Sequence, residues 1–412
     1  MAAQASARGW TPTHTLMVVV FGVGWAMDAF EVTLIGNVLG ALRQSFGIGA
    51  NAMSLLLAAW FAGLMLGAVV FGALADRFGR RRVFLSSLLL YGLATLAAAV
   101  APSFGALLLL RLLAGVGVGA EYSAINAAVT ELAPDASRGR AAALVLTFWP
   151  VGSLVASVLA WAVLSAVPAD LGWRLVFAVG GLIALSTVWF RRHLPESGRW
   201  QAASRAPLSR LWRECRSRLL LGMVLDFAEA SGYYGLFAFL PLVVLPALHL
   251  APAQLPVFYL VGSLGALVGG LAAALLLDRA GRWRTVAGFY TATAIATVLL
   301  ALVSGWGAAA LLPGFALVNL LATASWIAAY PTFSELFPTP LRATGIGASV
   351  GVGRIGAAIS PFLVGWVGSR SMPAALGMLA TFWLLGAIAM LIWHRTGGVE
   401  AGGATLEELA RA

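Results

Sequence analysis

Long apolar runs, separated by short polar turns, recur twelve times along the 412 residues of this chain. A helix needs about 20 apolar residues to cross the ~30 Å hydrocarbon core of a bilayer. Hydrophobic residues make up 61% of the chain and charged residues only 10%, which is too little polar surface for a water-soluble fold. We therefore predict an all-α integral membrane protein with spans near residues 16–40, 52–75, 83–101, 105–127, 139–166, 172–192, 219–246, 254–277, 285–304, 308–331, 342–368 and 373–393.

The basic residues are all arginine, and they gather on one side of the predicted membrane. The termini and the turns on their side carry 21 arginines, whereas the opposite turns carry only Arg43, Arg174 and Arg370. Because basic residues are retained on the cytoplasmic side, both termini are predicted to be cytoplasmic in a multi-pass protein of the inner (plasma) membrane. The net charge of +10 is thus topological, and it gives no reason to expect nucleic acid as a partner.

Two turn motifs occur twice, which indicates an internal duplication. The first motif recurs after 202 positions, as Asp76, Arg77, Gly79 and Arg80 and then as Asp278, Arg279, Gly281 and Arg282. The second recurs after 204 positions, as Glu131, Leu132, Pro134 and Arg138 and then as Glu335, Leu336, Pro338 and Arg342. We therefore predict two six-helix bundles over 16–192 and 219–394, joined by a cytoplasmic linker over 193–218, with cytoplasmic tails over 1–15 and 395–412.

Three stretches resemble signatures of the major facilitator superfamily. GALADRFGRRRV, from Gly72, resembles its loop signature between helices 2 and 3, and RLLAGVGVG, from Arg111, resembles its helix-4 signature. LPESGRW, from Leu194, resembles the PESPRW signature of sugar porters and organic-ion transporters. The resemblance implies that two bundles rock about a central site while the turn residues fasten their cytoplasmic ends. The gate residues are then Asp76, Arg77, Gly79, Arg80, Glu131, Arg138, Glu196, Arg199, Asp278, Arg279, Gly281, Arg282, Glu335 and Arg342.

Seven ionisable residues lie well inside the predicted spans, where a charge is costly unless it is paired, protonated or wet. They are Asp28, Glu31, Arg111, Glu121, Asp226, Glu229 and Arg354. Asp28 and Glu31 share one helix face, and two like charges so close favour a bound proton. The alternative is that one of them only bonds a neighbouring helix. Their spacing resembles the acid pair in helix 1 of nicotinate and aromatic-acid transporters.

Arg111 and Glu121 belong to the fourth span. We predict an ion pair between Arg111 and an acid of the first span. Glu121 has three possible roles: it could pair with an arginine, carry the proton or belong to a packing network. The glycines at 115, 117 and 119 predict one bare face for close helix packing.

Arg354, in the eleventh span, is the main indication of the substrate. Its fixed guanidinium donors suit a carboxylate, although a permanent pair with Asp226 or Glu229 is the alternative. Those two acids are further candidate proton carriers, and Asp226 could instead reach lipid headgroups. In the organic-ion transporters that this region resembles, an arginine here is typical of anion carriers. The aromatic residues predicted to line the cavity are Trp60, Trp149, Tyr233, Tyr234, Trp326 and Tyr330.

We expect a secondary transporter, not an enzyme, that imports a small, aromatic carboxylate such as nicotinate or benzoate with protons by alternating access. The alternatives are a proton-coupled efflux pump for drugs or organic cations, since buried acids outnumber buried arginines, and a sugar-type porter. The expected partners are the organic anion, the proton and the bilayer, and the protein is expected to be monomeric. No metal or cofactor is predicted, because Cys215 is the single cysteine and the histidines form no cluster. The segment after Arg395 is expected to be disordered or frayed.

Overall fold

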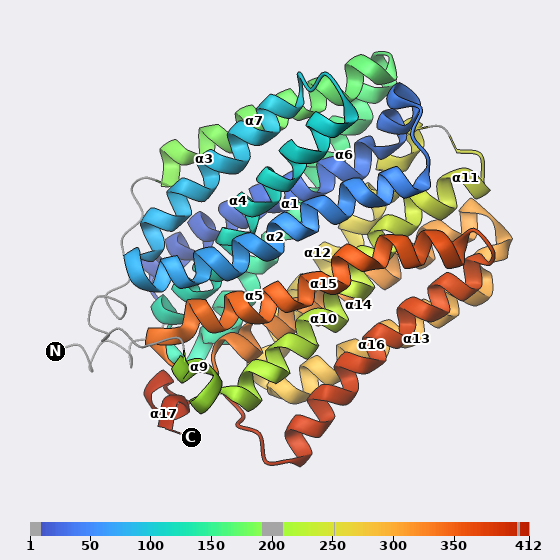
Figure 1. The fold of residues 1–412 in the computed structure, drawn as a ribbon. Helices are drawn as coiled ribbons and strands as arrows, with labels where there is room; N and C mark the ends of the chain where they lie inside the picture. Colours follow the sequence, from blue (N-terminus) through green and yellow to red (C-terminus); the bar gives the residue numbers. More distant parts are fainter. Residues whose placement is uncertain (1–9, 192–208, 251, 402–403, 412) are drawn as a thin grey trace.

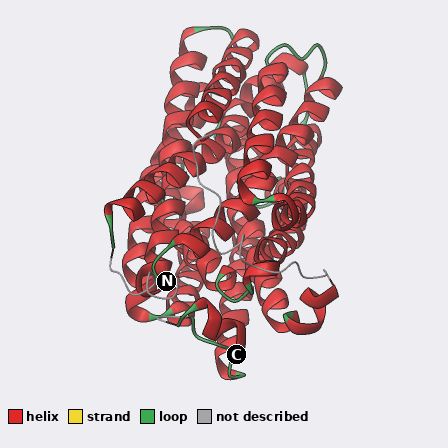
Figure 2. Ribbon diagram, turned by 90° about the vertical axis from the view of Figure 1, so that its left-hand side faces the viewer, coloured by secondary structure: helices red, strands yellow, loops and turns green. Residues whose placement is uncertain are grey.

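The structure of the protein is a computed structural model that describes residues 10–191, 209–250, 252–401 and 404–411. Every regular element in these ranges is helical (Figures 1 and 2). The helices before the gap are α1 (Pro12–Phe46), α2 (Ala50–Phe78), α3 (Arg80–Ala98), α4 (Phe104–Leu132), α5 (Arg138–Leu146), α6 (Phe148–Ala166) and α7 (Ala169–Arg191). Those after it are α9 (Ser209–Glu214), α10 (Arg216–Phe239), α11 (Leu245–Ala247), α12 (Leu255–Ala280), α13 (Arg282–Val303), α14 (Ala308–Ser334), α15 (Arg342–Gly368), α16 (Met372–Arg395) and α17 (Leu406–Arg411).

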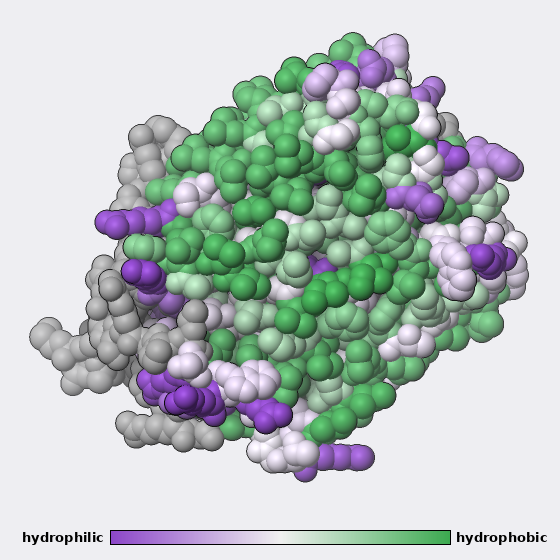
Figure 3. All heavy atoms as spheres, viewed as in Figure 1, coloured by the Kyte–Doolittle hydropathy of each residue, from purple (hydrophilic) through white to green (hydrophobic). Residues whose placement is uncertain are grey.

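Eleven helical segments among the described residues are long and apolar enough to cross a membrane. The third predicted span is α3, which begins with three arginines, and its described apolar stretch Leu85–Ala98 is shorter than these segments. Figure 3 shows apolar atoms over the middle of the molecule and polar atoms mainly at its two ends. Large side chains such as Leu66, Val70 and Leu302 are exposed in this apolar belt, which lipid would cover. The predicted all-α membrane fold is thus confirmed.

The two halves interlock reciprocally. Helices α1 to α7 pack mainly on one another, as do α10 to α16, and the halves meet where α2 packs on α15 and α12 packs on α5 and α6. In Figure 1, α2 (blue) and α15 (orange) run side by side. The second helix of each half therefore contacts the fifth of the other. Residues 192–208 of the predicted linker lie outside the described residues, so the exact domain bounds stay a prediction.

Glycines bring α2 and α4 into close contact. A Cβ on Gly63 or Gly67 would lie 2.1 Å from a carbonyl oxygen of α4, and one on Gly115 or Gly119 would lie as close to α2, at 2.2 and 2.1 Å. Gly117 instead faces α3, where a Cβ would come within 2.7 Å of a side chain. The prediction of one bare face is therefore wrong, because residues two apart point about 200° apart around a helix.

The fifth span is interrupted once, and the seventh span changes its helical form toward its end. Helix α5 ends where the Thr147 hydroxyl bonds the carbonyl of Ala143 at 2.7 Å, and α6 begins at the next residue. Helix α10 passes into a π-helical turn, η2 (Leu240–Val244), which contains Pro241. Proline lacks an N–H and disrupts the regular ladder. Both segments thus depart from a continuous α-helix within their spans.

The C-terminal segment is packed rather than frayed over the residues that the structure describes. Glu400 accepts hydrogen bonds from the backbone N–H groups of Arg282 and Trp283 at 2.8 and 3.3 Å, so it caps the start of α13. The carbonyl of Ala404 accepts from Arg138 of the first half at 3.4 Å. Leu406 and two neighbouring apolar residues are buried beneath it. The expectation of a frayed tail is wrong because these contacts hold the segment against both halves.

Candidate substrate-binding site

The first copy of the turn motif caps a helix of the other half. Gly79 has a φ of 101°, a conformation that favours glycine, and it turns α2 directly into α3. Just before it, Asp76 accepts hydrogen bonds from the backbone N–H and the hydroxyl of Thr344 at 2.8 and 2.6 Å. Thr344 lies in the first turn of α15, so the carboxylate faces the positive end of that helix.

The second copy makes the reciprocal contact. Asp278 accepts a bond from the backbone N–H of Arg140, in the first turn of α5, at 2.7 Å. Arg282 donates to the same carboxylate at 2.7 Å. A Cβ on Gly139 would lie 2.5 Å from an Asp278 oxygen, so glycine is what allows this approach. Each half thus caps a helix of the other at one end of the molecule, which we call the turn-motif end.

Buried ion pairs surround these caps. Arg342 pairs with Glu131 across the two halves at 3.3 Å, and Arg282 pairs with Glu335 at 3.0 Å. Burial raises the pKa of the Glu335 carboxyl, while Arg282 beside it and Arg138 of the other half oppose that shift. The turn-motif end is therefore closed and electrostatically linked in this structure.

The remaining predicted gate residues divide into two groups. Arg77 and Arg279 are exposed, and Gly281, with a φ of 87°, makes the turn between α12 and α13. Outside the described residues lie Glu196, Arg199 and the side chain of Arg80.

Arg111 lies in a closed network inside the first half. Its Nη1 is 2.5 Å from Glu31 Oε1, its Nη2 donates to the Thr95 hydroxyl at 3.0 Å, and Thr95 donates to the same Glu31 oxygen at 2.6 Å. The guanidinium lies 4.6 Å from the centre of the Phe177 ring. Arg111 and Glu31 are 0% and 1% exposed. The acid of the first span that Arg111 contacts is therefore Glu31, in a tight and dry pair.

The structure separates the predicted proton carriers. Glu31 is held by Arg111, and Asp28, one turn earlier on α1, is fully buried in the same half. Glu121 belongs to α4, but its side chain lies outside the described part of the chain. Asp226 and Glu229 lie on α10, beside Arg354.

Arg354, near the middle of α15, is held more closely by a hydroxyl than by its acids. Its Nη2 donates to the Tyr330 hydroxyl at 2.8 Å, and that hydroxyl donates to Asp226 at 2.7 Å. Its Nη1 lies 3.5 Å from a Glu229 oxygen and 3.8 Å from an Asp226 oxygen. Charge-assisted hydrogen bonds are normally about 2.7–2.9 Å long, so both carboxylate contacts are loose. Asp226 faces this cluster and not the lipid headgroups.

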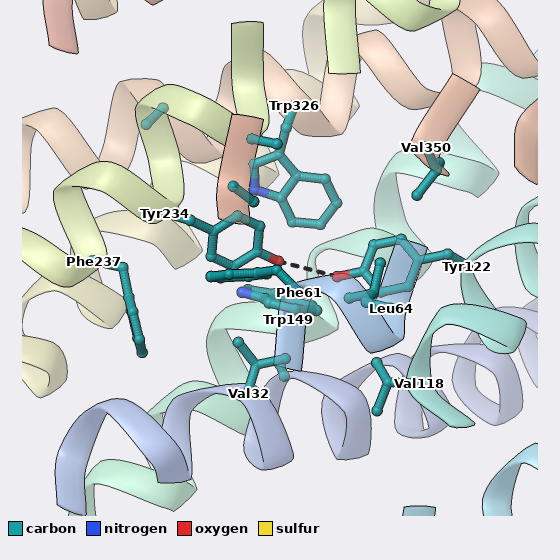
Figure 4. Packing of buried hydrophobic residues seen from close by; sticks show 14 of the residues in the cluster. Val32, Phe61, Leu64, Val118, Tyr122, Trp149, Tyr234, Phe237, Trp326 and Val350 are labelled. Carbon is teal, nitrogen blue, oxygen red and sulfur yellow. Dashed lines mark hydrogen bonds between the residues drawn. The ribbon is translucent and has the colours of Figure 1, made fainter. Parts of the chain in front are cut away.

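Aromatic side chains from both halves form a cage around Arg354. Its guanidinium carbon lies 4.9 Å from the ring centre of Tyr122 and 5.2 Å from that of Tyr234. The two tyrosine hydroxyls approach to 3.3 Å, and Figure 4 shows Trp149 and Trp326 beside them. A cation is attracted to the face of an aromatic ring. The guanidinium can bind the charged group of a planar anion, and the rings can pack on its aromatic body.

Sequence reasoning missed three aromatic residues of this cage. Tyr122 directly follows Glu121 in the sequence, and Trp25 lies one turn before Asp28, so aromatic neighbours of acids inside the predicted spans were the available signal. The ring centre of Trp25 lies 4.7 Å from that of Tyr122, and the ring centre of Phe61 lies 4.4 Å from that of Tyr234.

Trp60, which was predicted to line the cavity, lies behind the cage. Its ring packs edge-on against Phe61, with 5.1 Å between the ring centres, and its carbonyl oxygen would meet a Cβ on Gly115 of α4 at 2.2 Å. Neighbouring helix positions point about 100° apart, so Phe61 contacts the Tyr234 ring of the cage while the Trp60 side chain points in another direction.

The cage encloses a small cavity, which we call the arginine cavity. Among its lining residues are Tyr122, Trp149, Glu229, Tyr234, Tyr330 and Arg354. Its free volume is about 10 Å³, which is room for about one water molecule. A larger guest therefore needs the surrounding helices or rings to move apart. Trp149 and Tyr233 also line a second cavity, of about 20 Å³.

Two interlocked membrane bundles with a buried, loosely paired charge between them define a membrane transport protein, because the central site opens only when the halves move. Comparison with known proteins gives the family. Residues 16–361 match the family described as the Major Facilitator Superfamily. The chain belongs to this superfamily, and it is therefore a transporter and not an enzyme.

The chain is similar over nearly all of its length to proteins with named substrates. It is 30% identical to the niacin transporter NiaP of Acinetobacter baylyi, over 96% of each chain. It is 32% identical to the 3-(3-hydroxy-phenyl)propionate transporter of Escherichia coli, over 82% of this chain and 83% of that one. Among solved structures, the proton:xylose symporter XylE shares the fold with a TM-score of 0.82 at 16% identity, over 97% of this chain and 98% of that one.

Proposed function

We propose that this protein imports small aromatic carboxylates together with protons, across the inner membrane, by alternating access. Two lines support the proposal. The central cage combines one guanidinium with many ring faces, and relatives that cover most of the chain are named as transporters of niacin and of a hydroxyphenyl propionate.

The observation that carries the proposal is the contrast between the two buried arginines. Arg111 is bound to its carboxylate at 2.5 Å and shares it with a threonine, so a substrate would have to break a short ion pair. Arg354 keeps its carboxylates at 3.5 Å and 3.8 Å. A substrate carboxylate can take the bidentate donor geometry that those acids leave unused. Arg354 is therefore the substrate arginine and Arg111 a structural one.

Charge counting links the substrate to the proton. With Asp226 and Glu229 both ionised, the cluster with Arg354 carries a net charge of −1 and repels an anion. One bound proton makes it neutral, and a second makes it +1. A buried site favours neutrality, so the binding of one anion favours the uptake of protons by these acids. In this scheme Glu229 and Asp226 carry the coupled proton beside the substrate. Asp28 is a further proton site in the other half.

The turn-motif end is the cytoplasmic end in this proposal, because it carries most of the arginines. Its reciprocal caps, Asp76 on α15 and Asp278 on α5, hold the cytoplasmic side closed. Breaking them and rocking the halves apart would release the substrate and the proton into the cell. Both termini would then be cytoplasmic.

Uptake into proteoliposomes tests the proposal. Radiolabelled nicotinate and benzoate should accumulate under an inward proton gradient. When an uncoupler removes the gradient, the labelled acid should only reach equal concentrations on both sides of the membrane. Arg354→Gln should abolish uptake, whereas Thr396→Ala, an exposed substitution beyond the last span, should not. Absence of gradient-driven uptake of any aromatic acid by folded protein would refute it.

A second candidate, proton-coupled efflux of organic cations, has one observation in its favour. The central cluster holds two carboxylates and one guanidinium, so in its fully ionised form it attracts a cation. Efflux of a labelled organic cation, driven by an opposing proton gradient and lost in Glu229→Gln, would favour this function. Unchanged cation content in the same vesicles would exclude it.

A further inference from the structure

The second cavity, beyond Trp149 and Tyr233, is lined only by uncharged residues. Its polar lining includes Thr33 of α1, Ser153 of α6, and Ser263 of α12. The rings of Phe237 and Phe315 form part of its apolar wall. We call it the hydroxyl chamber. A charged group would lose its hydration there without gaining a partner of opposite charge, so its lining suits a neutral guest.

Three hydroxyls in the chamber form a chain across the two halves. Thr33 donates to Ser153 at 2.9 Å, and Ser153 and Ser263 lie 2.9 Å apart. Ser263 also lies 2.7 Å from the carbonyl oxygen of Tyr259, and its single proton serves one of these two partners. Each hydroxyl has one proton and two lone pairs. Thr33 therefore uses its proton on Ser153 and keeps lone pairs that can accept a hydrogen bond from a guest hydroxyl.

The chamber lies in line with the arginine cavity along α10. Glu229 and Tyr234 line the first cavity, Tyr233 lines both, and Phe237 lines the chamber. Four residues of helix rise about 6 Å, so the chamber begins about 6 Å, and extends to about 12 Å, beyond Glu229. A single ring that carries its carboxylate directly ends near Tyr233. An aryl ring on a short alkanoic chain reaches the chamber.

The wall between the cavities is a weak contact. The indole N–H of Trp149 donates to the Tyr233 hydroxyl at 3.3 Å, which is beyond the usual length of about 2.9–3.0 Å for such a bond. Rotation of one of these two side chains would join the cavities into one elongated site. Its two ends would differ in chemistry, with the guanidinium at one end and neutral hydroxyls at the other.

We propose that the hydroxyl chamber is a second subsite for the transported acid, and that it binds a ring hydroxyl held away from the carboxylate by a short alkyl chain. This inference rests on the proposed function, and it names the substrate class as hydroxyaryl alkanoates in preference to compact ring acids. The carboxylate binds at Arg354, and the ring passes between Trp149 and Tyr233. The hydroxyl then donates to the chain that begins at Thr33.

Binding of two matched acids to the purified protein in nanodiscs tests this subsite. The probes are 3-phenylpropanoate and its ring-hydroxylated counterparts, titrated calorimetrically. The protein should bind the best hydroxylated acid about 3- to 10-fold more tightly, as expected of one neutral hydrogen bond. Thr33→Val and Ser153→Ala should each bring the ratio of the two dissociation constants close to one.

Ser157→Ala is the matched control. Ser157 lies one turn beyond Ser153 on α6 and is fully buried, but it does not line the chamber. Its hydroxyl donates to the backbone carbonyl of Ser153 at 2.9 Å and accepts from Asn37 at 3.3 Å. This variant removes the same group from the same helix and should keep the preference for the hydroxylated acid. Loss of the preference in Ser157→Ala as well would assign the effect to helix packing and overturn the subsite.

The outcomes separate the subsite from the proposed function. If the unaltered protein binds both acids equally and Arg354→Gln binds neither, the hydroxyl chamber is not a subsite. The proposed function is not affected by that result. Binding of neither acid by folded protein overturns the subsite, and if benzoate and nicotinate also fail to bind, the proposed function is overturned with it. A preference that survives Thr33→Val together with Ser153→Ala places the ring hydroxyl elsewhere and refutes the inference.

Discussion

Removal of the Asp76 carboxylate should open the turn-motif end by a calculable amount. Asp76→Ala deletes two hydrogen bonds to Thr344 and a negative charge at the N-terminus of α15. Hydrogen bonds to a charged group contribute about 1.5–3 kcal/mol each, and a charge at a helix end about 0.3–1 kcal/mol. Because the site is partly exposed, water replaces part of this. We expect the closed end to lose about 2–3 kcal/mol, which is about a 30- to 150-fold change in the closed-to-open ratio.

Spin labels on α2 and α12 would measure this change as a distance distribution. Arg77→Cys and Arg279→Cys are exposed positions in opposite halves, and Cys215→Ser removes the native cysteine. In this background Asp76→Ala should increase the population of long distances. Thr344→Val, which removes only the hydroxyl bond, should give a smaller increase. A distribution that Asp76→Ala leaves unchanged would refute the argument that this cap holds the two halves together.

Three further substitutions have expected outcomes. Glu31→Gln should destabilise the protein by about 3–5 kcal/mol, because it leaves Arg111 buried without its counter-charge; the double variant with Arg111→Met should recover much of the lost melting temperature, and failure to do so would contradict a purely structural pair. Gly139→Ala places a Cβ 2.5 Å from an Asp278 oxygen and should lengthen the same spin-label distances. Gly288→Ala, whose Cβ meets nothing within 4 Å, should leave them unchanged. Glu400→Gln removes the charge that caps α13 and should speed proteolysis after residue 395 several-fold, and unchanged proteolysis would show that the C-terminal segment is held by its apolar contacts alone.

The fold followed from the sequence because it depends on long, uninterrupted signals. Twelve apolar runs and two repeated turn motifs were enough to predict the duplicated bundle, since both arise from the cost of polar groups in lipid. The third span shows the limit of that signal. The arginines that mark the turn also form the first turn of α3, so this helix of 19 residues begins with three charges and not with an apolar run.

The site was predictable in composition but not in pairing. The buried charges identified Arg111 and Arg354 equally well, and only their distances to carboxylates separate a tight pair from a loose one. Those distances depend on how α4 packs beside α1 and how α15 packs beside α10, which no local pattern encodes. Trp60 shows the same limit, because a difference of one position on α2 decides which aromatic faces the cage.

The packed C-terminal segment could not be predicted because its partners lie far away in the sequence. Gly- and Ala-rich composition is typical of a frayed tail. Its hydrogen bonds run to distant elements: the first N–H groups of α13 donate to the Glu400 carboxylate, and the Arg138 guanidinium donates to the Ala404 carbonyl. Such bonds leave no periodic pattern in the sequence.

The proton balance of substrate binding tests the central claim most directly. Benzoate or 3-phenylpropanoate is mixed with the detergent-purified protein near neutral pH in weak buffer, and a pH indicator reports the protons taken up per bound anion. If Arg354 exchanges loosely held acids for the substrate carboxylate, the unaltered protein should take up close to one proton per anion. Glu229→Gln should reduce this uptake strongly while binding persists. Binding without proton uptake in the unaltered protein, or uptake that is the same in Glu229→Gln and Asp226→Asn as in the unaltered protein, would contradict the account.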